Sequence, residues 1–338
     1  MMRLGVLLPH RQVVLQSARR PPQEDCWKVA RLADEAGMDI WVGDSIVAKP
    51  RLEPLTTLAY LAGITHRAKL GTAVLLPALR QPTVLANMLS NIDQLSRGRL
   101  VLGLGAGWKL PEIEREWEAC GRDHKRRIRD LEEHITLWRE IWSGEPVNHE
   151  GSGFKLTGQS FAPLPWTEQG PPILITAGNR AEIFPAQLER FARLGDGIIT
   201  TYVTDEDCRT LRRACEAALV RHARVLPGFP LCVYTTVRLD PDRARAERET
   251  EQFLKAYYGG GIGLRGLMGL GPGALVVDTL RRYQAAGVTD LCVRFGGTDQ
   301  VTQMEAFVQE VVPAFTGAQS RSLADPPSHR LTVDPRGE

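Results

Sequence analysis

The segment that spans residues 98–108 reads Gly98-Arg99-Leu100-Val101-Leu102-Gly103-Leu104-Gly105-Ala106-Gly107-Trp108. Its apolar half, Leu100 to Leu104, is bounded by turn residues, and that pattern predicts a strand buried on both faces. Glycines at the carboxyl end of such a strand leave the backbone bare, so that a flat ligand can lie against it. The same glycines also suit a tight turn from a strand into a helix. Taken alone, the segment leaves both readings open.

The rest of the chain repeats the same unit, a strand followed by a loop and a helix. Helical periodicity separates each predicted strand from the next, as in the amphipathic segment Arg126–Trp142. Eight parallel strands in one alternating series predict a closed (β/α)8 TIM barrel with inserted loops over its carboxyl-terminal face. A doubly wound open sheet is the alternative, because alternation alone does not show closure. The predicted strands are Leu4–Leu8, Ile40–Val42, Lys69–Leu75, Leu100–Leu104, Pro172–Thr176, Gly197–Thr201, Leu231–Leu239 and Leu291–Phe295.

Residues 1–316 are predicted to form a single domain, followed by a tail of low hydrophobicity over residues 317–338. Two segments interrupt the alternating series. Residues 143–171 are rich in glycine and proline and are predicted to form an inserted hairpin or loop that packs over the barrel. Residues 257–273 contain eight glycines and are predicted to be a mobile loop at the active site. The run Gly261–Gly266 in this loop has the spacing GxGxxG, but a nucleotide fingerprint needs a preceding strand and a following helix that are not predicted here.

The composition of the 338 residues is that of a globular protein, with 43% hydrophobic residues. The 42 basic residues are balanced by 40 acidic ones, and no basic stripe carries interleaved aromatic residues, which argues against a nucleic-acid partner. No apolar run approaches the length of a membrane span, and the first predicted strand leaves no room for a signal peptide. The six cysteines contain no CxxC pair and the histidines show no metal-ligand spacing, so we expect a cytoplasmic protein without a metal site.

The active site of a (β/α)8 barrel lies at the carboxyl ends of its strands, so the residues there are the candidates. After the fifth strand, the turn Ala177-Gly178-Asn179-Arg180 precedes a predicted helix over 181–194. Backbone N–H groups at a helix N-terminus bind phosphate, and Arg180 could add a charge-assisted bond, although Asn179 could merely cap the helix. The other candidates at strand ends are Asp44, Ser45, Thr72, Ala73, Val74, Gly105, Ala106, Gly107, Trp108 and Arg294.

Three of the side chains near strand ends could take part in chemistry. His10 could transfer protons or serve only as a structural histidine. Asp44 could bind a ring hydroxyl or imide, or cap the loop that follows it. Trp108 could wall a planar ligand or pack beneath the insertion. The chain lacks a Ser/His/Asp order, an HExxH motif and a P-loop, which indicates that a cofactor supplies the chemistry.

Motifs along residues 1–316 resemble those of the bacterial luciferase-like oxidoreductase family. They read Glu35-Ala36-Gly37-Met38-Asp39-Ile40-Trp41-Val42-Gly43-Asp44, Lys69-Leu70-Gly71-Thr72-Ala73-Val74, Ser96-Arg97-Gly98-Arg99 with Gly107-Trp108, Pro171-Pro172-Ile173-Leu174-Ile175 with Asp196-Gly197, and Ala286-Gly287-Val288 with Arg294-Phe295. The resemblance implies a (β/α)8 barrel that binds FMN or the deazaflavin F420 at the carboxyl ends of the strands. It also implies a small-molecule substrate and a homodimer whose candidate interfaces are the predicted helices over 82–95 and 126–142.

By position, the resemblance implies a non-prolyl cis peptide at Ala73-Val74 that props the isoalloxazine ring. Gly105 and Gly107, with Ala106 between them, would lie along the ring, and Thr72 and Asp44 would line the same site. Ala177, Gly178, Asn179 and Arg180 would hold the phosphate, while His10, Asp44, Ser45 and Trp108 are the candidates for a catalytic role. The insertion and the glycine-rich loop would cover the substrate.

The chain departs from the sugar-phosphate dehydrogenases of the F420 branch at two positions. Those enzymes carry Asp-His after the second strand and a glutamate after the fourth-strand glycines, where this chain has Asp44-Ser45 and Trp108. The departure argues against a glucose-6-phosphate dehydrogenase activity. Two activities remain. The first is a monooxygenase that uses O2 and reduced FMN, which a flavin reductase would supply. The second is an F420-dependent enzyme that transfers hydride to or from an imine, alkene or alcohol. Because Ser45 stands where the F420 branch carries histidine, it favours the monooxygenase that uses FMN. A non-catalytic flavin-binding protein is a third hypothesis.

Overall fold

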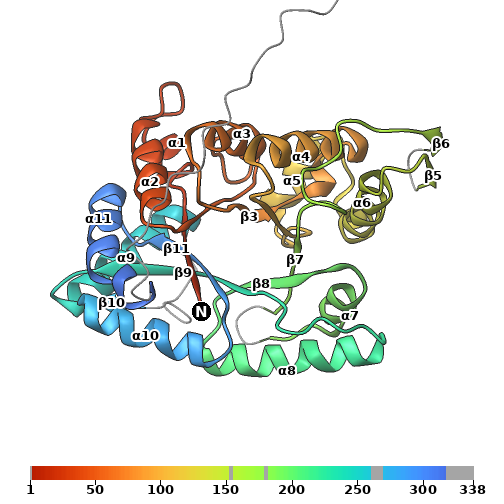
Figure 1. Ribbon diagram of the computed structural model, residues 1–338. Helices are drawn as coiled ribbons and strands as arrows, with labels where there is room; N and C mark the ends of the chain where they lie inside the picture. The colour runs from red at the N-terminus through yellow and green to blue at the C-terminus, as the bar shows by residue number, and fades with distance from the viewer. Residues whose placement is uncertain (1, 152–154, 179–181, 260–268, 317–338) are drawn as a thin grey trace, which may run out of the picture.

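A computed structural model of the chain describes residues 2–151, 155–178, 182–259 and 269–316 (Figure 1). Eight parallel strands form a ring in which each strand pairs with two neighbours of the ring. The ring closes where β8 pairs with β9, which excludes the open sheet and confirms the predicted TIM barrel. In ring order the strands are β1 (Arg3–Leu7), β2 (Asp39–Val42), β3 (Leu70–Leu75), β4 (Leu100–Leu104), β7 (Ile173–Thr176), β8 (Gly197–Thr201), β9 (Leu231–Leu239) and β11 (Asp290–Phe295).

Helices surround the ring and follow the strands in alternation (Figure 1). Their starts carry ordinary helix signals: proline occupies the first turn of four of them, and Thr204 and Asp207 form a reciprocal capping box at the start of α8. The helices are α1 (Gln12–Gln16), α2 (Glu24–Glu35), α3 (Pro54–Ile64), α4 (Pro82–Ser96), α5 (Pro111–Ala119), α6 (Arg127–Trp142), α7 (Pro185–Leu194), α8 (Asp205–Arg221), α9 (Arg243–Tyr258), α10 (Gly273–Ala285) and α11 (Gln300–Glu310), with short 3-10 turns at Pro77–Leu79, His124–Arg126 and Val312–Ala314.

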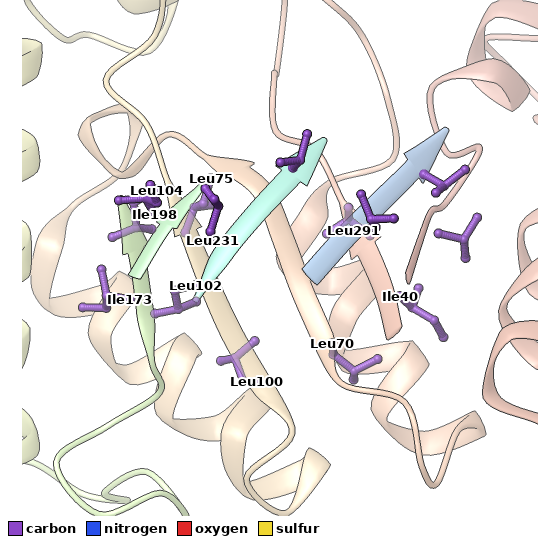
Figure 2. Packing of buried hydrophobic residues seen from close by; sticks show 14 of the residues in the cluster. Ile40, Leu70, Leu75, Leu100, Leu102, Leu104, Ile173, Ile198, Leu231 and Leu291 are labelled. Atoms are coloured by element: carbon purple, nitrogen blue, oxygen red, sulfur yellow. The ribbon is translucent and has the colours of Figure 1, made fainter. Parts of the chain in front are cut away.

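The main hydrophobic core lies between the outer face of the barrel and the helices. Alternate strand residues such as Ile40, Leu70 and Leu102 point outward into this layer and are fully buried there (Figure 2). Residues between them in sequence point into the barrel, as expected from the two-residue period of a strand. Burial on both faces explains why the strands read as continuous apolar runs.

The lumen of the barrel is filled by its own side chains. Trp41 extends from β2 across the interior and lies against Gly5 of β1 and Gly71 of β3. A Cβ at Gly5 would lie 2.5 Å from Trp41 Nε1, and a Cβ at Gly71 would overlap the indole ring. Below this layer, Arg3 and Asp39 form an ion pair at the amino-terminal end. The barrel is therefore plugged from below, and only its carboxyl-terminal end remains for a ligand.

The insertion between α6 and β7 contains the predicted hairpin, formed by the antiparallel strands β5 (Val147–Glu150) and β6 (Lys155–Gln159). Its described contacts are with the outer helices and not with the mouth of the barrel. Asn87 and Gln94 of α4 donate to the carbonyls of Ala162 and Leu164, at 3.4 and 2.8 Å, and the hairpin lies beside α6 (Figure 1). These contacts correct the expectation that the insertion packs over the barrel.

The glycine-rich segment contributes a short strand, β10 (Leu270–Gly271), which pairs with the end of β9 outside the ring. The two ends of the predicted loop are helical instead, because Tyr257 and Tyr258 belong to α9 and Gly273 begins α10. Residues 260–268 of the loop and the predicted tail, residues 317–338, lie outside the described residues. All six cysteines are described, and none forms a disulfide. Among the helices of the described ranges, none has the length and apolar character that crossing a membrane requires.

Candidate active site

The third strand carries an irregularity at the mouth of the barrel. Its register against β4 shifts between Thr72 and Leu75, and the Ala73–Val74 peptide bond is cis. Thr72 Oγ1 donates to the carbonyl of Gly103 on β4, at 2.8 Å, just before the shift. The Ala73 and Val74 side chains are half-buried and belong to the apolar cluster of the lumen. The structure thus confirms the cis peptide that the family resemblance implied.

The fourth strand ends beside this bulge. A Cβ at Gly105 would lie 2.8 Å from Val74 Cγ2, so the two strands leave no space for a side chain there. Gly107 has φ +76, and its Cβ position faces Trp117 of α5 at 2.7 Å from Cη2. Gly107 therefore permits close packing of α5, which the sequence reading did not foresee. Trp108 is 47% exposed.

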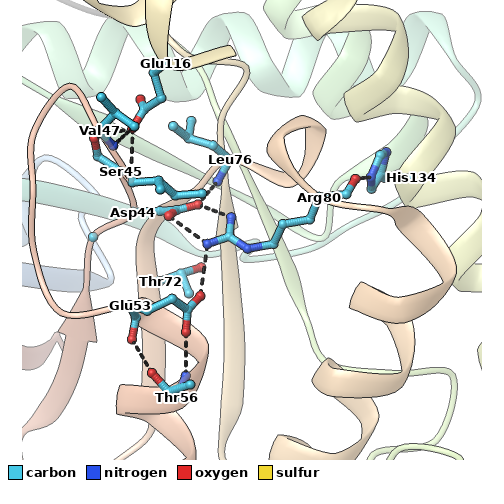
Figure 3. Close-up of polar contacts among 12 residues, drawn as sticks. Asp44, Ser45, Val47, Glu53, Thr56, Thr72, Leu76, Arg80, Glu116 and His134 are labelled. Carbon is cyan, nitrogen blue, oxygen red and sulfur yellow. Dashed lines mark hydrogen bonds and ion pairs between the residues drawn. The ribbon is translucent and has the colours of Figure 1, made fainter. Parts of the chain in front are cut away.

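Asp44 is fully engaged by other residues of the protein (Figure 3). Arg80 Nη1 and Nη2 donate to its two carboxylate oxygens at 2.6 and 3.0 Å, and Leu76 N donates to Oδ2 at 2.9 Å. Arg80 Nη2 also reaches Glu53 Oε1, at 3.0 Å. Burial of the Arg80 guanidinium lowers its pKa, but the hydrogen bonds to Asp44 and the negative charge of Asp44 outweigh this effect, so that the pKa of Arg80 is raised. Asp44 holds the β3–α4 connection in place and presents no free oxygen to a ligand.

Ser45 is likewise committed to a neighbour (Figure 3). Its hydroxyl donates to Glu116 Oε1 of α5 at 2.7 Å, and the same oxygen accepts from the backbone N–H of Ile46 and Val47 at 2.5 and 2.7 Å. Glu116 is fully buried, and its Oε2 has no hydrogen-bond partner among the described residues. The pair of Ser45 and Glu116 fixes the loop that follows β2.

His10 lies at the end of β1 with both ring nitrogens against backbone. Nδ1 is 2.8 Å from the Leu8 carbonyl, to which it donates, and Nε2 accepts from Gly43 N at 3.2 Å. Complete burial, reinforced by the nearby charge of Arg51, lowers the pKa of His10 to about 4. The imidazole is therefore neutral at pH 7, and proton transfer by His10 would require these bonds to break.

Two arginines beside His10 form no ion pair with a carboxylate of the described residues. Arg11 is 6% exposed, donates from Nη2 to the Tyr257 carbonyl at 2.9 Å, and has no described hydrogen-bond partner for Nε and Nη1. Arg51 Nε donates to the Lys49 carbonyl at 3.0 Å. Burial lowers the pKa of Arg11, and the charge of Arg51 lowers it further. The mouth thus carries positive charge that the described side chains do not neutralise.

The predicted phosphate turn is only partly described. Ala177 N donates to the Ile199 carbonyl at 3.2 Å, and Gly178 N donates to Gln187 Oε1 at 2.9 Å. Asn179 and Arg180 lie outside the described residues. Helix α7 begins at Pro185 and not near 181, so the turn is separated from the helix N-terminus, which corrects the expected geometry.

One group of aromatic residues was not recognised in the sequence. Arg294 of β11 points into the lumen and is 3% exposed; its Nη1 donates to Tyr258 Oη at 2.6 Å and its Nη2 to Thr236 Oγ1 at 2.7 Å. Tyr234 Oη lies 3.5 Å from Tyr258 Oη. A charged residue at an inward position of a buried strand was the available signal, because such a charge is rare without a partner.

A cavity opens on the same end of the barrel, between α1, α9 and the loop after β11. Its wall includes Gln12, Phe253, Tyr257 and Thr298. The wall segments follow the carboxyl ends of β1, β9 and β11, and Tyr257 also contacts Arg11. The described residues contain no group of three or more side chains suited to hold a metal ion.

The sequence profile described as luciferase-like monooxygenase matches residues 2–286. The chain belongs to this family. It is 32% identical to an F420-dependent glucose-6-phosphate dehydrogenase of Mycolicibacterium fortuitum over 252 residues, which are 69% of this chain and 70% of that enzyme. It is also 32% identical over 189 residues to an F420-dependent glucose-6-phosphate dehydrogenase of Mycobacterium tuberculosis (strain CDC 1551 / Oshkosh). That match spans about half of each protein, 55% of this chain and 54% of the relative.

Solved structures of the family share the fold at lower identity. An F420-dependent secondary alcohol dehydrogenase in complex with an F420-acetone adduct superimposes with a TM-score of 0.76 at 15% identity, covering 93% of this chain and 99% of that one. The oxygenating constituent of 3,6-diketocamphane monooxygenase from Pseudomonas putida, in complex with FMN, has a TM-score of 0.72 at 18% identity, covering 92% and 98%. The luciferase-like barrel is therefore common to enzymes of both cofactor classes.

Proposed function

We propose that this protein is an F420-dependent oxidoreductase that transfers hydride between the deazaflavin and a small organic substrate, such as an imine, an activated alkene or an alcohol. The observation that carries the choice of cofactor is that Arg11 and Arg51, at the mouth, form no ion pair with a carboxylate of the described residues. F420 bears an acidic oligoglutamyl tail in addition to its phosphate, so it gains more than FMN from unneutralised arginines. The F420-dependent relatives with 32% identity support the same choice.

Few basic residues at the mouth remain free to bind the anionic groups of a cofactor. Arg80 is neutralised by Asp44 and Glu53, and Arg265 lies outside the described residues. Arg51 remains, with Arg11 beside it. We therefore assign Arg51 and Arg11 to the anionic part of the cofactor. The half-buried Ala73 and Val74 offer an apolar surface to its ring.

The residues around the bulge orient the ligand and exclude water, and a bound deazaflavin would supply hydride chemistry. The rigid bulge at Ala73–Val74 limits how deeply a flat ring can enter, because Trp41 and its neighbours fill the space below. Asp44 and Ser45 act through structure, since each is bonded to a neighbouring residue. They stabilise the wall of the site and do not exchange protons with the substrate.

A monooxygenase that uses reduced FMN and O2 is the second candidate. It is favoured by the engagement of Asp44, Ser45 and His10 in internal bonds, because activation of O2 by a reduced flavin needs no acid–base residue at these positions. In that case a separate flavin reductase would supply the reduced cofactor.

Calorimetric titration of the protein with F420 and, separately, with FMN tests the proposal. F420 is expected to bind tightly and FMN weakly, and Arg51→Gln is expected to weaken F420 binding about tenfold, or 1.4 kcal/mol. The deazaflavin that lacks phosphate and tail should bind Arg51→Gln and the wild type equally. Arg19→Gln, at an exposed arginine of the α1–α2 loop, is the matched control. Tight binding of FMN alone would overturn the proposal in favour of the monooxygenase.

Turnover is tested next, with F420 and a panel of secondary alcohols, ketones and cyclic imines. The loss or gain of the oxidised deazaflavin absorbance reports hydride transfer in either direction. O2 consumption in the presence of reduced FMN and the same panel serves as the test of the second candidate.

A further inference from the structure

Arg294 occupies an unusual position for a charged side chain. It extends from β11 into the upper layer of the lumen, where Tyr234 and Thr236 of β9 point inward beside it. It is 3% exposed, and it forms no ion pair with a carboxylate in the described part of the chain; its Nε is buried without a hydrogen-bond partner there. A buried cation without an acidic partner is costly, so its retention calls for a compensating role.

Aromatic rings compensate part of this cost. The guanidinium carbon lies 4.9 to 5.8 Å from the ring centroids of Tyr257, Tyr258, Tyr234 and Phe253. Such cation–π contacts stabilise a desolvated guanidinium. The two hydrogen bonds of the Nη atoms to Tyr258 and Thr236 then fix its orientation. Arg294 is therefore held rigidly against the Tyr258 hydroxyl.

Tyr258 is the member of this group that is suited to meet a ligand. It is half-buried, whereas Arg294 is buried behind it, and its hydroxyl receives the Arg294 hydrogen bond at 2.6 Å. Tyr258 is the last residue of α9, and Tyr234, whose hydroxyl lies 3.5 Å from that of Tyr258, belongs to the same apolar cluster of the lumen as Ala73 and Val74. The phenol thus lies at the same end of the barrel as the surface on which we place the cofactor ring, on the side opposite to β3.

We propose that Tyr258 is the acid–base residue of the reaction and that Arg294 is the residue that positions and activates it. This inference rests on the proposed F420-dependent function. In the oxidation of an alcohol, the bound deazaflavin would supply the acceptor for the C–H hydride, and the phenolate oxygen of Tyr258 takes the O–H proton and becomes a neutral phenol, so that the substrate is left as a carbonyl. In reduction both steps reverse, and Tyr258 returns the proton.

Electrostatics support the assignment. Burial opposes ionisation of Tyr258, but the charge of Arg294 and the hydrogen bonds from its neighbours lower the pKa of Tyr258 to about 8. The pKa of Tyr234, by contrast, is raised by burial. The charged and titratable groups near Tyr258 are Arg294, Tyr234, Tyr202, Tyr257, Arg11 and Lys49, whose Nζ lies 3.4 Å from the Tyr258 carbonyl. None of them is a carboxylate that would offset Arg294.

A spectrophotometric pH titration of the full chain tests the activation without any substrate. The tyrosinate absorbance should show one of the six tyrosines ionising near pH 8, well before the ordinary pKa of about 10. Tyr258→Phe should remove this early step, and Arg294→Gln should move it above pH 10, while Arg294→Lys restores it in part. Tyr60→Phe, at an exposed tyrosine of α3, should leave the step unchanged. Absence of the early step in the wild type would overturn the inference.

The catalytic role is read from the F420-loaded enzyme. Tyr258→Phe should lower kcat about 100-fold and leave F420 affinity and KM within about threefold, because the phenol ring is retained. The pH profile of kcat for alcohol oxidation should rise toward an apparent pKa near 8 in the wild type and lose that inflection in Tyr258→Phe. An unchanged kcat in Tyr258→Phe, or F420 binding without turnover of any alcohol, ketone or imine in the panel, would overturn the role.

The two proposals fail in different ways. If F420 binds and the early ionisation is missing, the inference about Tyr258 and Arg294 is wrong and the cofactor assignment stands. If the early ionisation is present and F420 does not bind, the proposed function is wrong, and the acid–base role in hydride transfer falls with it.

Discussion

Arg80 joins Asp44 through two hydrogen bonds, of 2.6 and 3.0 Å, and thereby ties the connection between β3 and α4 to the loop that follows β2. The Asp44 side chain is completely buried and that of Arg80 is 14% exposed. A third bond from Arg80 reaches Glu53, whose side chain is 38% exposed. The pair forms one wall beside the Ala73–Val74 bulge, so its contribution can be measured as stability of the fold.

Asp44→Asn should destabilise the protein by about 3 kcal/mol, because it leaves the Arg80 charge buried with only the exposed Glu53 as a partner. Glu53→Gln is the matched control and should cost less than about 1 kcal/mol, since it removes only the partly exposed arm of the network. Urea unfolding followed by circular dichroism gives both values. Equal losses for the two variants would contradict the dominance of the Asp44 pair.

His10 makes stability depend on pH in the mildly acidic range. Its folded pKa of about 4 lies below the pKa of about 6.5 in an unfolded chain, so the unfolded chain binds a proton that the folded protein does not. The contribution of neutral His10 to the free energy of unfolding is fully present above pH 6.5 and declines as the pH falls toward 4. The decline amounts to about 2 kcal/mol between pH 7 and pH 5. His10→Asn should flatten this part of the profile. His66→Asn, at an exposed histidine, should leave it unchanged.

Gly71→Ala should destabilise the barrel by about 2 kcal/mol, because the added methyl group would overlap the Trp41 ring. Combining it with Trp41→Leu should recover part of the loss, which a double-mutant cycle in urea would report as a favourable coupling energy. Gly63→Ala, in α3, meets no heavy atom within 4 Å and should be neutral or stabilising. Additive effects of the two lumen substitutions would show that Trp41 does not press on Gly71.

Gly107→Ala tests whether Gly107 is needed for the close packing of α5 or for a cofactor ring that lies against it. The Cβ position faces Trp117 at 2.7 Å, so the variant should displace α5 and lower the unfolding midpoint by several degrees, which corresponds to about 2 kcal/mol. Gly121→Ala has a similar positive φ, +67, but meets nothing within 4 Å, so it isolates the cost of the backbone conformation. Loss of F420 or FMN binding at an unchanged midpoint would instead favour a ring that lies against Gly107.

The barrel itself was accessible from the sequence, because strands buried on both faces read as apolar runs and the helices between them show a clear period. All eight predicted strands are present, and the cis peptide was found at Ala73–Val74 through the family motif. Helix α5 is absent from the predicted elements, although Pro111, two acidic residues in the first turn and the pair Ile113 and Trp117 at i and i+4 are ordinary helix signals. The predicted start of α7 near residue 181 is too early, since Pro185 occupies the first helical position.

The side-chain partnerships of the site could not be predicted in the same way. Asp44 and Arg80 are 36 residues apart, and Arg294 and Tyr258 are also 36 residues apart, each pair on different elements. A residue at a strand end is equally compatible with a free side chain and with one bonded to a distant neighbour. Only the relative placement of neighbouring strands and helices decides between them, and one sequence carries no direct record of it.

The indole of Trp41, lodged between Gly5 and Gly71, has a kinetic meaning beyond the packing it provides. The indole blocks the axis of the barrel, so a ligand can bind and dissociate only at the carboxyl-terminal end. With a cofactor and a substrate bound as proposed, the ligand that lies deeper is expected to bind first and to dissociate last. Steady-state kinetics should therefore follow an ordered sequence, in which an excess of the outer ligand slows the release of the inner one.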